Sequence, residues 1–68
     1  MISVNSTAIA RVDYVASTRT LRLEYTSGRI YVYFEVPPQV YEQLLAADSV
    51  GEFVNREIKP RFDCAEVE

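Results

Sequence analysis

Hydrophobic and polar positions alternate from Ala8 to Val36, which is the period of strands that bury one face. Three runs share this alternation and are rich in tyrosine and β-branched residues, as strands are: residues 8–15, 21–25 and 30–36. Turn-forming residues separate the runs at 16–19 and at Ser27-Gly28. The first half of the chain is therefore predicted to be a three-stranded antiparallel meander.

The register of both hairpins is predicted by requiring apolar side chains to face one another, because a one-residue slip moves every side chain to the other face. In the first hairpin the apolar pairs are then Tyr14–Leu21, Val12–Leu23 and Ala10–Tyr25. The outer face carries two pairs of opposite charge, which supports this register: Asp13–Arg22 and Arg11–Glu24. For the second hairpin, a two-residue turn at Ser27-Gly28 gives the pairs Tyr25–Ile30, Leu23–Val32 and Leu21–Phe34. Tyr31 and Tyr33 are then predicted on the outer face.

The period changes after Pro37-Pro38, which cannot continue a central strand but suits the first turn of a helix. A helix is predicted over 39–47, with its apolar face formed by Val40, Tyr41, Leu44, Leu45 and Ala47. A second helix is predicted from Ser49, which has capping-box spacing to Glu52, and its apolar residues are Val50, Phe53, Val54 and Ile58. It ends near Lys59, before Pro60. The predicted fold class is α+β, a three-stranded antiparallel meander followed by two short helices packed on one face (βββαα).

The length of 68 residues allows one domain, assigned to residues 3–62, followed by an acidic tail at 63–68 that is expected to fray. Hydrophobic residues make up 49% and charged residues 25%, the balance of a packed domain rather than a disordered segment. No apolar run approaches the roughly 18 residues that span a membrane. The start of the chain lacks the basic and apolar regions of a signal peptide, so a cytoplasmic location without membrane contact is expected.

The residues needed for common catalytic and metal chemistry are scarce. The chain has no histidine, which removes serine–histidine and cysteine–histidine nucleophile pairs and the commonest metal ligand. Its one cysteine, Cys64, lies among acidic residues that disfavour a thiolate, and one thiol does not make a metal site. Gly28 and Gly51 are isolated, so no glycine-rich phosphate loop is present. We therefore expect no enzyme activity, no cofactor and no metal.

Several short motifs, in their order and spacing, resemble the KTSC domain, a small family named for its place at the C-terminus of some lysyl-tRNA synthetases. The family also occurs as stand-alone bacterial proteins. The motifs that carry the resemblance are Val12-Asp13-Tyr14, Leu21-Arg22-Leu23, the central Tyr31-Val32-Tyr33, Val36-Pro37-Pro38 and Phe53-Val54-Asn55. The resemblance covers about residues 3 to 62, and Asn5-Ser6 stands where a pair of serines is expected. It implies no settled activity, and RNA binding follows from it only by association with a synthetase.

Tyr31 and Tyr33 are the strongest candidates for a binding surface, with Arg22 and Arg29 close enough to contact phosphates. Two exposed tyrosines one step apart on a strand can stack bases. Cross-strand packing and a cation–π pair between Arg22 and Tyr33 explain the same residues equally well. The net charge of −3 favours this structural interpretation, because nucleic-acid binders carry a positive excess.

The expected function is that of a small non-catalytic binding or interaction module. Its partner would be a protein or a second copy of the chain, because edge strands invite pairing and tyrosine is enriched at interfaces. The alternative is binding of RNA or single-stranded nucleic acid through Tyr31, Tyr33, Arg22 and Arg29.

Overall fold

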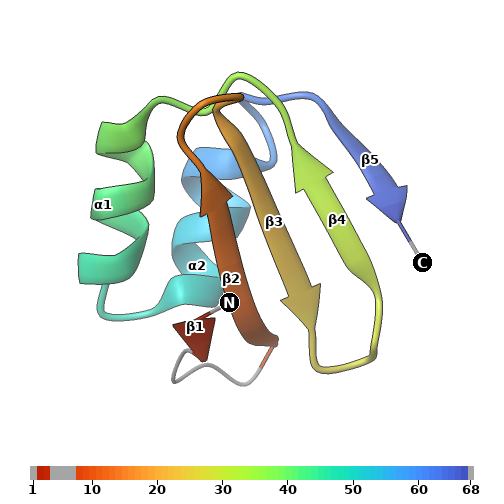
Figure 1. Cartoon of the computed structure of the whole chain (residues 1–68). Helices are drawn as coiled ribbons and strands as arrows, with labels where there is room; N and C mark the ends of the chain where they lie inside the picture. Colours follow the sequence, from red (N-terminus) through yellow and green to blue (C-terminus); the bar gives the residue numbers. More distant parts are fainter. Residues whose placement is uncertain (1, 4–7, 68) are drawn as a thin grey trace.

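The chain forms an antiparallel sheet with its helices on one face, and the computed structural model describes residues 2–3 and 8–67 (Figure 1). The five strands lie in sequence order: β1 (Ile2–Ser3), β2 (Ile9–Val15), β3 (Thr20–Tyr25), β4 (Ile30–Tyr33) and β5 (Cys64–Val67). The helical segments are α1 (Pro38–Ala46), α2 (Val50–Phe53) and a π-helical continuation, η1 (Val54–Ile58). The α+β class and the two helices on one face are confirmed. The start containing Asn5-Ser6 lies outside the described residues.

Two strands extend the predicted meander, one at each edge of the sheet. Strand β5 pairs antiparallel with β4 over residues that were expected to be a frayed tail, so that expectation is wrong for Cys64–Val67. All four residues of β5 are exposed, which gives the sequence no apolar alternation to reveal a strand. Backbone hydrogen bonds to β4, rather than buried side chains, define this strand.

The first hairpin has the predicted register over most of its length. Strands β2 and β3 pair Tyr14 with Leu21 and Val12 with Leu23, and both charge pairs lie on the outer face. The register shifts between Ile9 and Arg11, so Ile9, and not Ala10, lies opposite Tyr25. Ile9 is 1% exposed, because this irregularity turns the larger side chain into the core.

The second hairpin differs from its predicted register by one residue. The turn contains three residues, since the Tyr25 N–H donates to the Arg29 carbonyl at 2.8 Å and the Gly28 N–H donates to the Tyr25 carbonyl at 2.9 Å. Gly28 has φ of 96°, the left-handed conformation that a three-residue turn with a bulge requires. The extra residue changes the pairs to Leu21–Tyr33, Leu23–Tyr31 and Arg22–Val32. Tyr31 and Tyr33 therefore stand on the helix-covered face, opposite to the prediction.

The second helix begins as predicted but widens before it ends. The Glu52 N–H donates to the Ser49 side-chain oxygen at 3.3 Å, which caps α2. The Lys59 N–H donates to the Val54 carbonyl at 2.9 Å, a bond across five residues that marks the π-helical turn. Lys59 follows this turn directly, and its ammonium group lies near the ring of Tyr25 on the sheet.

The core lies between the sheet and the helices. Its buried side chains are Ile9, Val12, Leu21, Leu23, Tyr33, Val36, Leu44, Val50, Phe53, Val54 and Ile58. Leu44 is the buried residue of α1, whereas Leu45, predicted on the same apolar face, is 42% exposed. In Figure 1 the helices lie beside and behind β1 to β3, and β4 and β5 extend beyond them. Among the described residues no helix is long and apolar enough to cross a membrane.

Candidate functional site

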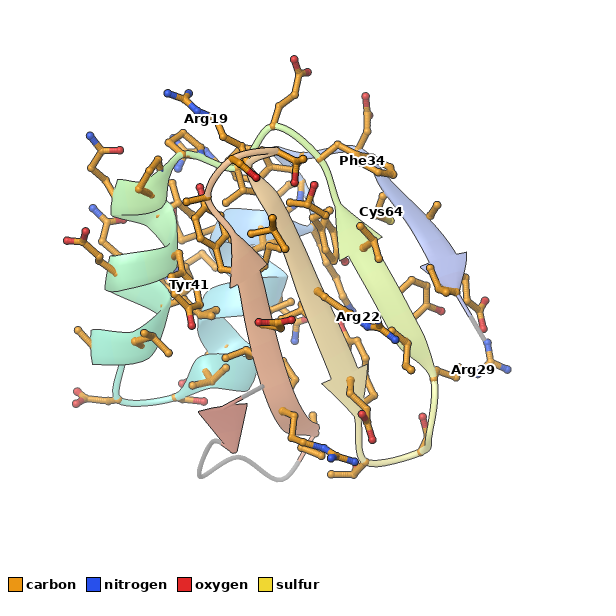
Figure 2. All side chains as sticks on the ribbon, in the orientation of Figure 1. Arg19, Arg22, Arg29, Phe34, Tyr41 and Cys64 are labelled. Atoms are coloured by element: carbon orange, nitrogen blue, oxygen red, sulfur yellow. The ribbon has the colours of Figure 1, made fainter. Side chains whose placement is uncertain are left out.

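The structure divides the predicted binding surface between the two faces of the sheet. Arg22 lies on the outer face, paired in register with Asp13 and Val32. Tyr33 is 3% exposed and Tyr31 is partly buried, both on the inner face, so neither is the open stacking platform that was predicted. Only Arg29 remains exposed beside these tyrosines, and Figure 2 shows it near the C-terminal end of β5.

A pocket of about 460 Å³ opens on the inner face where β4 and β5 extend beyond the helices. It is lined by side chains from three strands, the second turn and the end of η1: Tyr25, Ser27, Arg29, Tyr31, Tyr33, Lys59 and Cys64. The corrected register explains this arrangement. Arg29 lies opposite Tyr25 at the turn, and β5 pairs Cys64 with Tyr33 and Glu66 with Tyr31.

Three tyrosine rings form the apolar wall of the pocket. Tyr25 and Tyr31 pack edge to face, with ring centroids 5.5 Å apart and an interplanar angle of 82°. The Lys59 ammonium lies 5.8 Å from the centroid of the Tyr25 ring, within cation–π range. The site thus combines aromatic surface with a cation above it, and a second cation, Arg29, stands at the pocket's edge.

Burial controls the protonation of the pocket's phenols. Desolvation raises the pKa of Tyr33, and the neighbouring Tyr25 and Cys64 raise it further. Desolvation also raises the pKa of Tyr25. Both phenols therefore stay neutral near pH 7 and offer O–H groups rather than a base. The Tyr31 hydroxyl, followed by the Glu66 carboxylate, raises the pKa of Arg29, which remains a cation.

The Tyr25 hydroxyl is buried and has no hydrogen-bond partner among the described residues. Tyr33 is close enough to lower the pKa of Tyr25 in opposition to burial, yet the two groups do not meet the geometry of a hydrogen bond. A buried polar group without a partner destabilises a fold unless a ligand or water satisfies it. The burial of the Tyr25 hydroxyl in this pocket is thus not explained by the packing of the domain alone.

We predict that Tyr25→Phe raises the free energy of unfolding by about 1 kcal/mol, because it removes an unsatisfied hydroxyl. The matched control is Tyr14→Phe, which removes a hydroxyl that donates to the Val36 carbonyl at 2.6 Å. That variant is expected to lose about 1 kcal/mol. Urea denaturation followed by far-UV circular dichroism measures both. Equal losses in the two variants would show that the Tyr25 hydroxyl has a partner in solution.

A second tyrosine pair lies outside the pocket and has a structural role. Tyr14 and Tyr41 stack with centroids 4.8 Å apart and planes 13° from parallel, which joins β2 to α1. Burial and the nearby Asp13 raise the pKa of Tyr41. Because Tyr14 already donates to Val36, the geometry of this pair is accounted for by packing and one hydrogen bond.

Of the residues predicted from the sequence, Arg29, Tyr31 and Tyr33 line the pocket, and the structure adds Tyr25, Lys59 and Cys64 beside them. The feature of the sequence that could have grouped Tyr25 with the other two tyrosines is the turn that contains Gly28. A three-residue turn with Gly28 in the left-handed conformation places all three tyrosines on one face. Among the described residues, no group of three or more acidic or cysteine side chains is arranged to hold a metal ion.

The fold and the pocket define a small α+β domain with a tyrosine-lined site at one edge of its sheet. The sequence model of the KTSC domain matches residues 5–62, and the chain therefore belongs to the KTSC domain family. The family model ends before β5, so Cys64, which lines the pocket, lies beyond the matched residues.

Relatives include both stand-alone proteins and much longer ones. A protein of Tsukamurella paurometabola is 48% identical over 62 residues, which cover 91% of this chain and 92% of that protein. A lysine–tRNA ligase of Nostoc punctiforme is 39% identical over 62 residues, which cover 91% of this chain but only 11% of the ligase. A crystal structure of a KTSC domain protein from Yersinia pestis has a TM-score of 0.91 and 28% identity, and the match covers 97% of this chain and 93% of that chain.

Proposed function

We propose that this KTSC domain is a non-catalytic binding module and that the tyrosine pocket is its ligand site. The observation that carries the proposal is the meeting of three tyrosines and two cations in one pocket of about 460 Å³. Ligand pockets commonly have volumes of roughly 300–1,000 Å³, apolar walls and a few converging polar groups. The neutral phenols and the unpartnered Tyr25 hydroxyl suit recognition rather than proton transfer.

The pocket favours a planar group that carries a negative charge. Aromatic rings line the wall, and Arg29 and Lys59 supply positive charge at two places on its border. A planar ligand would pack against Tyr31 and Tyr25, and its anionic group would reach the cations. A protein interface built on two exposed tyrosines has less support, because Tyr33 is almost fully buried.

RNA is the second candidate, and the observation that favours it is the presence of lysine–tRNA ligases among the relatives. An unpaired base entering the pocket would have the planar shape that the tyrosines suit, and its phosphate would lie near Arg29. The domain would then add contacts to a larger RNA-binding protein. This role differs from the predicted stacking on an open Tyr31–Tyr33 platform, since only one base would enter.

An amide-shift titration of isotope-labelled protein tests both candidates, first with phenyl phosphate and indole-3-acetate and then with a single-stranded RNA pool and bulk tRNA at two salt concentrations. We expect shifts concentrated at Tyr25, Tyr31 and Cys64, and an affinity that falls roughly tenfold in Arg29→Gln with Lys59→Gln. Arg22→Gln is the matched control, since it removes an exposed arginine from the opposite face. Shifts centred on Arg22, or an unperturbed pocket with every ligand, would reject the proposed site.

A further inference from the structure

The two cations of the pocket, Arg29 and Lys59, are neutralised less closely than Arg11, which forms an ion pair on the outer face. Arg29 Nη1 lies 3.7 Å from Glu66 Oε2, too far for a hydrogen bond. On the outer face, by contrast, Arg11 donates to Glu24 at 2.8 Å. The Arg29–Glu66 contact is therefore loose, and a better-placed anion can replace it.

Lys59 has no carboxylate within ion-pair distance among the described residues, although it follows a helix rich in charge. Its basic neighbours Arg56 and Arg61 both pair with Glu57, at 3.4 and 3.0 Å. Lys59 instead lies over the Tyr25 ring. The pocket thus has one cation with a cation–π contact and one held by a displaceable carboxylate.

The charge balance selects the kind of anion that fits. Once Glu66 leaves Arg29, two positive charges face the pocket, and a monoanionic carboxylate neutralises only one of them. A phosphate monoester carries between one and a half and two negative charges near pH 7, and it offers three acceptor oxygens. Its oxygens can accept two bonds from one guanidinium, which a contact at 3.7 Å does not provide.

The rest of the pocket selects the body of the ligand. A volume of about 460 Å³ exceeds the space of one benzene ring, and it accommodates a planar heterocycle with an attached sugar. The wall presents neutral phenol hydroxyls and the Ser27 hydroxyl among the apolar surfaces. Hydroxyls beside aromatic rings suit a base whose edge carries nitrogen and oxygen atoms.

Resting on the proposed role of the pocket, we propose that its ligand is a nucleoside monophosphate group, with the base against the tyrosines and the phosphate on Arg29 and Lys59. Glu66 is the specificity-determining residue, because it holds Arg29 until a dianionic phosphate displaces it. Its position opposite Tyr31 on β5 places the competing carboxylate beside Arg29, which lines the pocket. The same chemistry is offered by a free mononucleotide and by the phosphorylated end of a single strand.

Calorimetric titration of AMP and adenosine into the wild type and Glu66→Gln tests this proposal at pH 7.5. We expect AMP to bind roughly threefold to tenfold more tightly to Glu66→Gln, and adenosine to bind equally weakly to both proteins. Glu24→Gln is the matched control, because it removes a carboxylate of the same charge from the outer face, and its affinity for AMP should equal that of the wild type. Glu66 is exposed, so its replacement preserves the fold.

A short single strand with a 5′-phosphate and the same strand without it distinguish the two sources of the ligand. A strand end is the source if the phosphorylated strand binds more tightly than AMP, and a free mononucleotide is the source if AMP binds more tightly. Equal affinity of AMP for the wild type and Glu66→Gln, equal affinity of AMP and adenosine, or no nucleotide binding at all would overturn the inference. The wider binding role is judged separately, by whether phenyl phosphate and indole-3-acetate perturb the pocket.

Discussion

Replacing Tyr33 by alanine is expected to lower the free energy of unfolding by about 3–4 kcal/mol, as truncation of a buried aromatic ring does. Tyr33 is 3% exposed, lies opposite Leu21 and belongs to the core cluster. Small domains have total stabilities on the order of 0.05–0.15 kcal/mol per residue, so the loss removes a large part of the stability. Urea denaturation followed by circular dichroism gives the change.

The neighbouring variant Val32→Ala is the matched control for this prediction. Val32 lies opposite Arg22 on the outer face, and we expect its truncation to lower the free energy of unfolding by about 1 kcal/mol or less. The register predicted from sequence reverses this order, because it places Val32 against Leu23 and exposes Tyr33. A larger loss from Val32→Ala than from Tyr33→Ala would therefore contradict the register in the structure.

This stability effect decides which variants can test ligand binding. A loss of binding in Tyr33→Ala would not separate a missing ligand contact from an unfolded domain. Arg29 and Lys59 are exposed, and their replacement leaves the core intact. They are consequently the better positions for testing the pocket.

The two hairpins show why one register was predictable and the other was not. In the first hairpin, apolar pairs on one face and opposite charges on the other agree on a single alignment of β2 with β3. In the second hairpin, the charged residues of β3 face tyrosines in the predicted register and aliphatic side chains in the observed one. Neither register gives a pair of opposite charges, so charge does not select between them. Tyrosine fits either face, since its ring is apolar and its hydroxyl is polar. Gly28 then admits turns of two or three residues, and side-chain packing decides between them.

The missing part of the site follows from the same limits of the sequence pattern. Strand β5 has no buried residue, and the acidic residues in and around it, Asp63, Glu66 and Glu68, are also typical of a tail. The antiparallel pairing with β4 nevertheless brings Cys64 to the pocket and Glu66 to within 3.7 Å of Arg29. Lys59 reaches the site through the π-helical turn, which changes the direction in which the helix ends. The pairing of β5 with β4 and the π-helical turn thus determine which side chains reach the pocket. Neither feature produces a periodic pattern of hydrophobic residues in the sequence.

The helix α1 provides the second prediction with a large effect. Leu44 is fully buried and is the buried residue of this helix, so Leu44→Ala is expected to lower the free energy of unfolding by about 3–4 kcal/mol. Loss of the side chain leaves a cavity beside the helical segments and the first strands, which together form the core. Thermal and urea denaturation should show the same reduction.

Leu45→Ala is its matched control, because the neighbouring leucine is 42% exposed although the helical pattern predicted it on the apolar face. We expect a change within about 0.5 kcal/mol, as is usual for surface positions. Similar losses from both leucines would mean that α1 packs in another rotation about its axis than the structure shows. Since α1 lies near the β1–β2 edge of the sheet, away from β4 and β5 (Figure 1), Leu45→Ala should also retain full affinity for any pocket ligand. Loss of affinity in this stable variant would require coupling between α1 and the pocket, which the packing of the two regions gives no reason to expect.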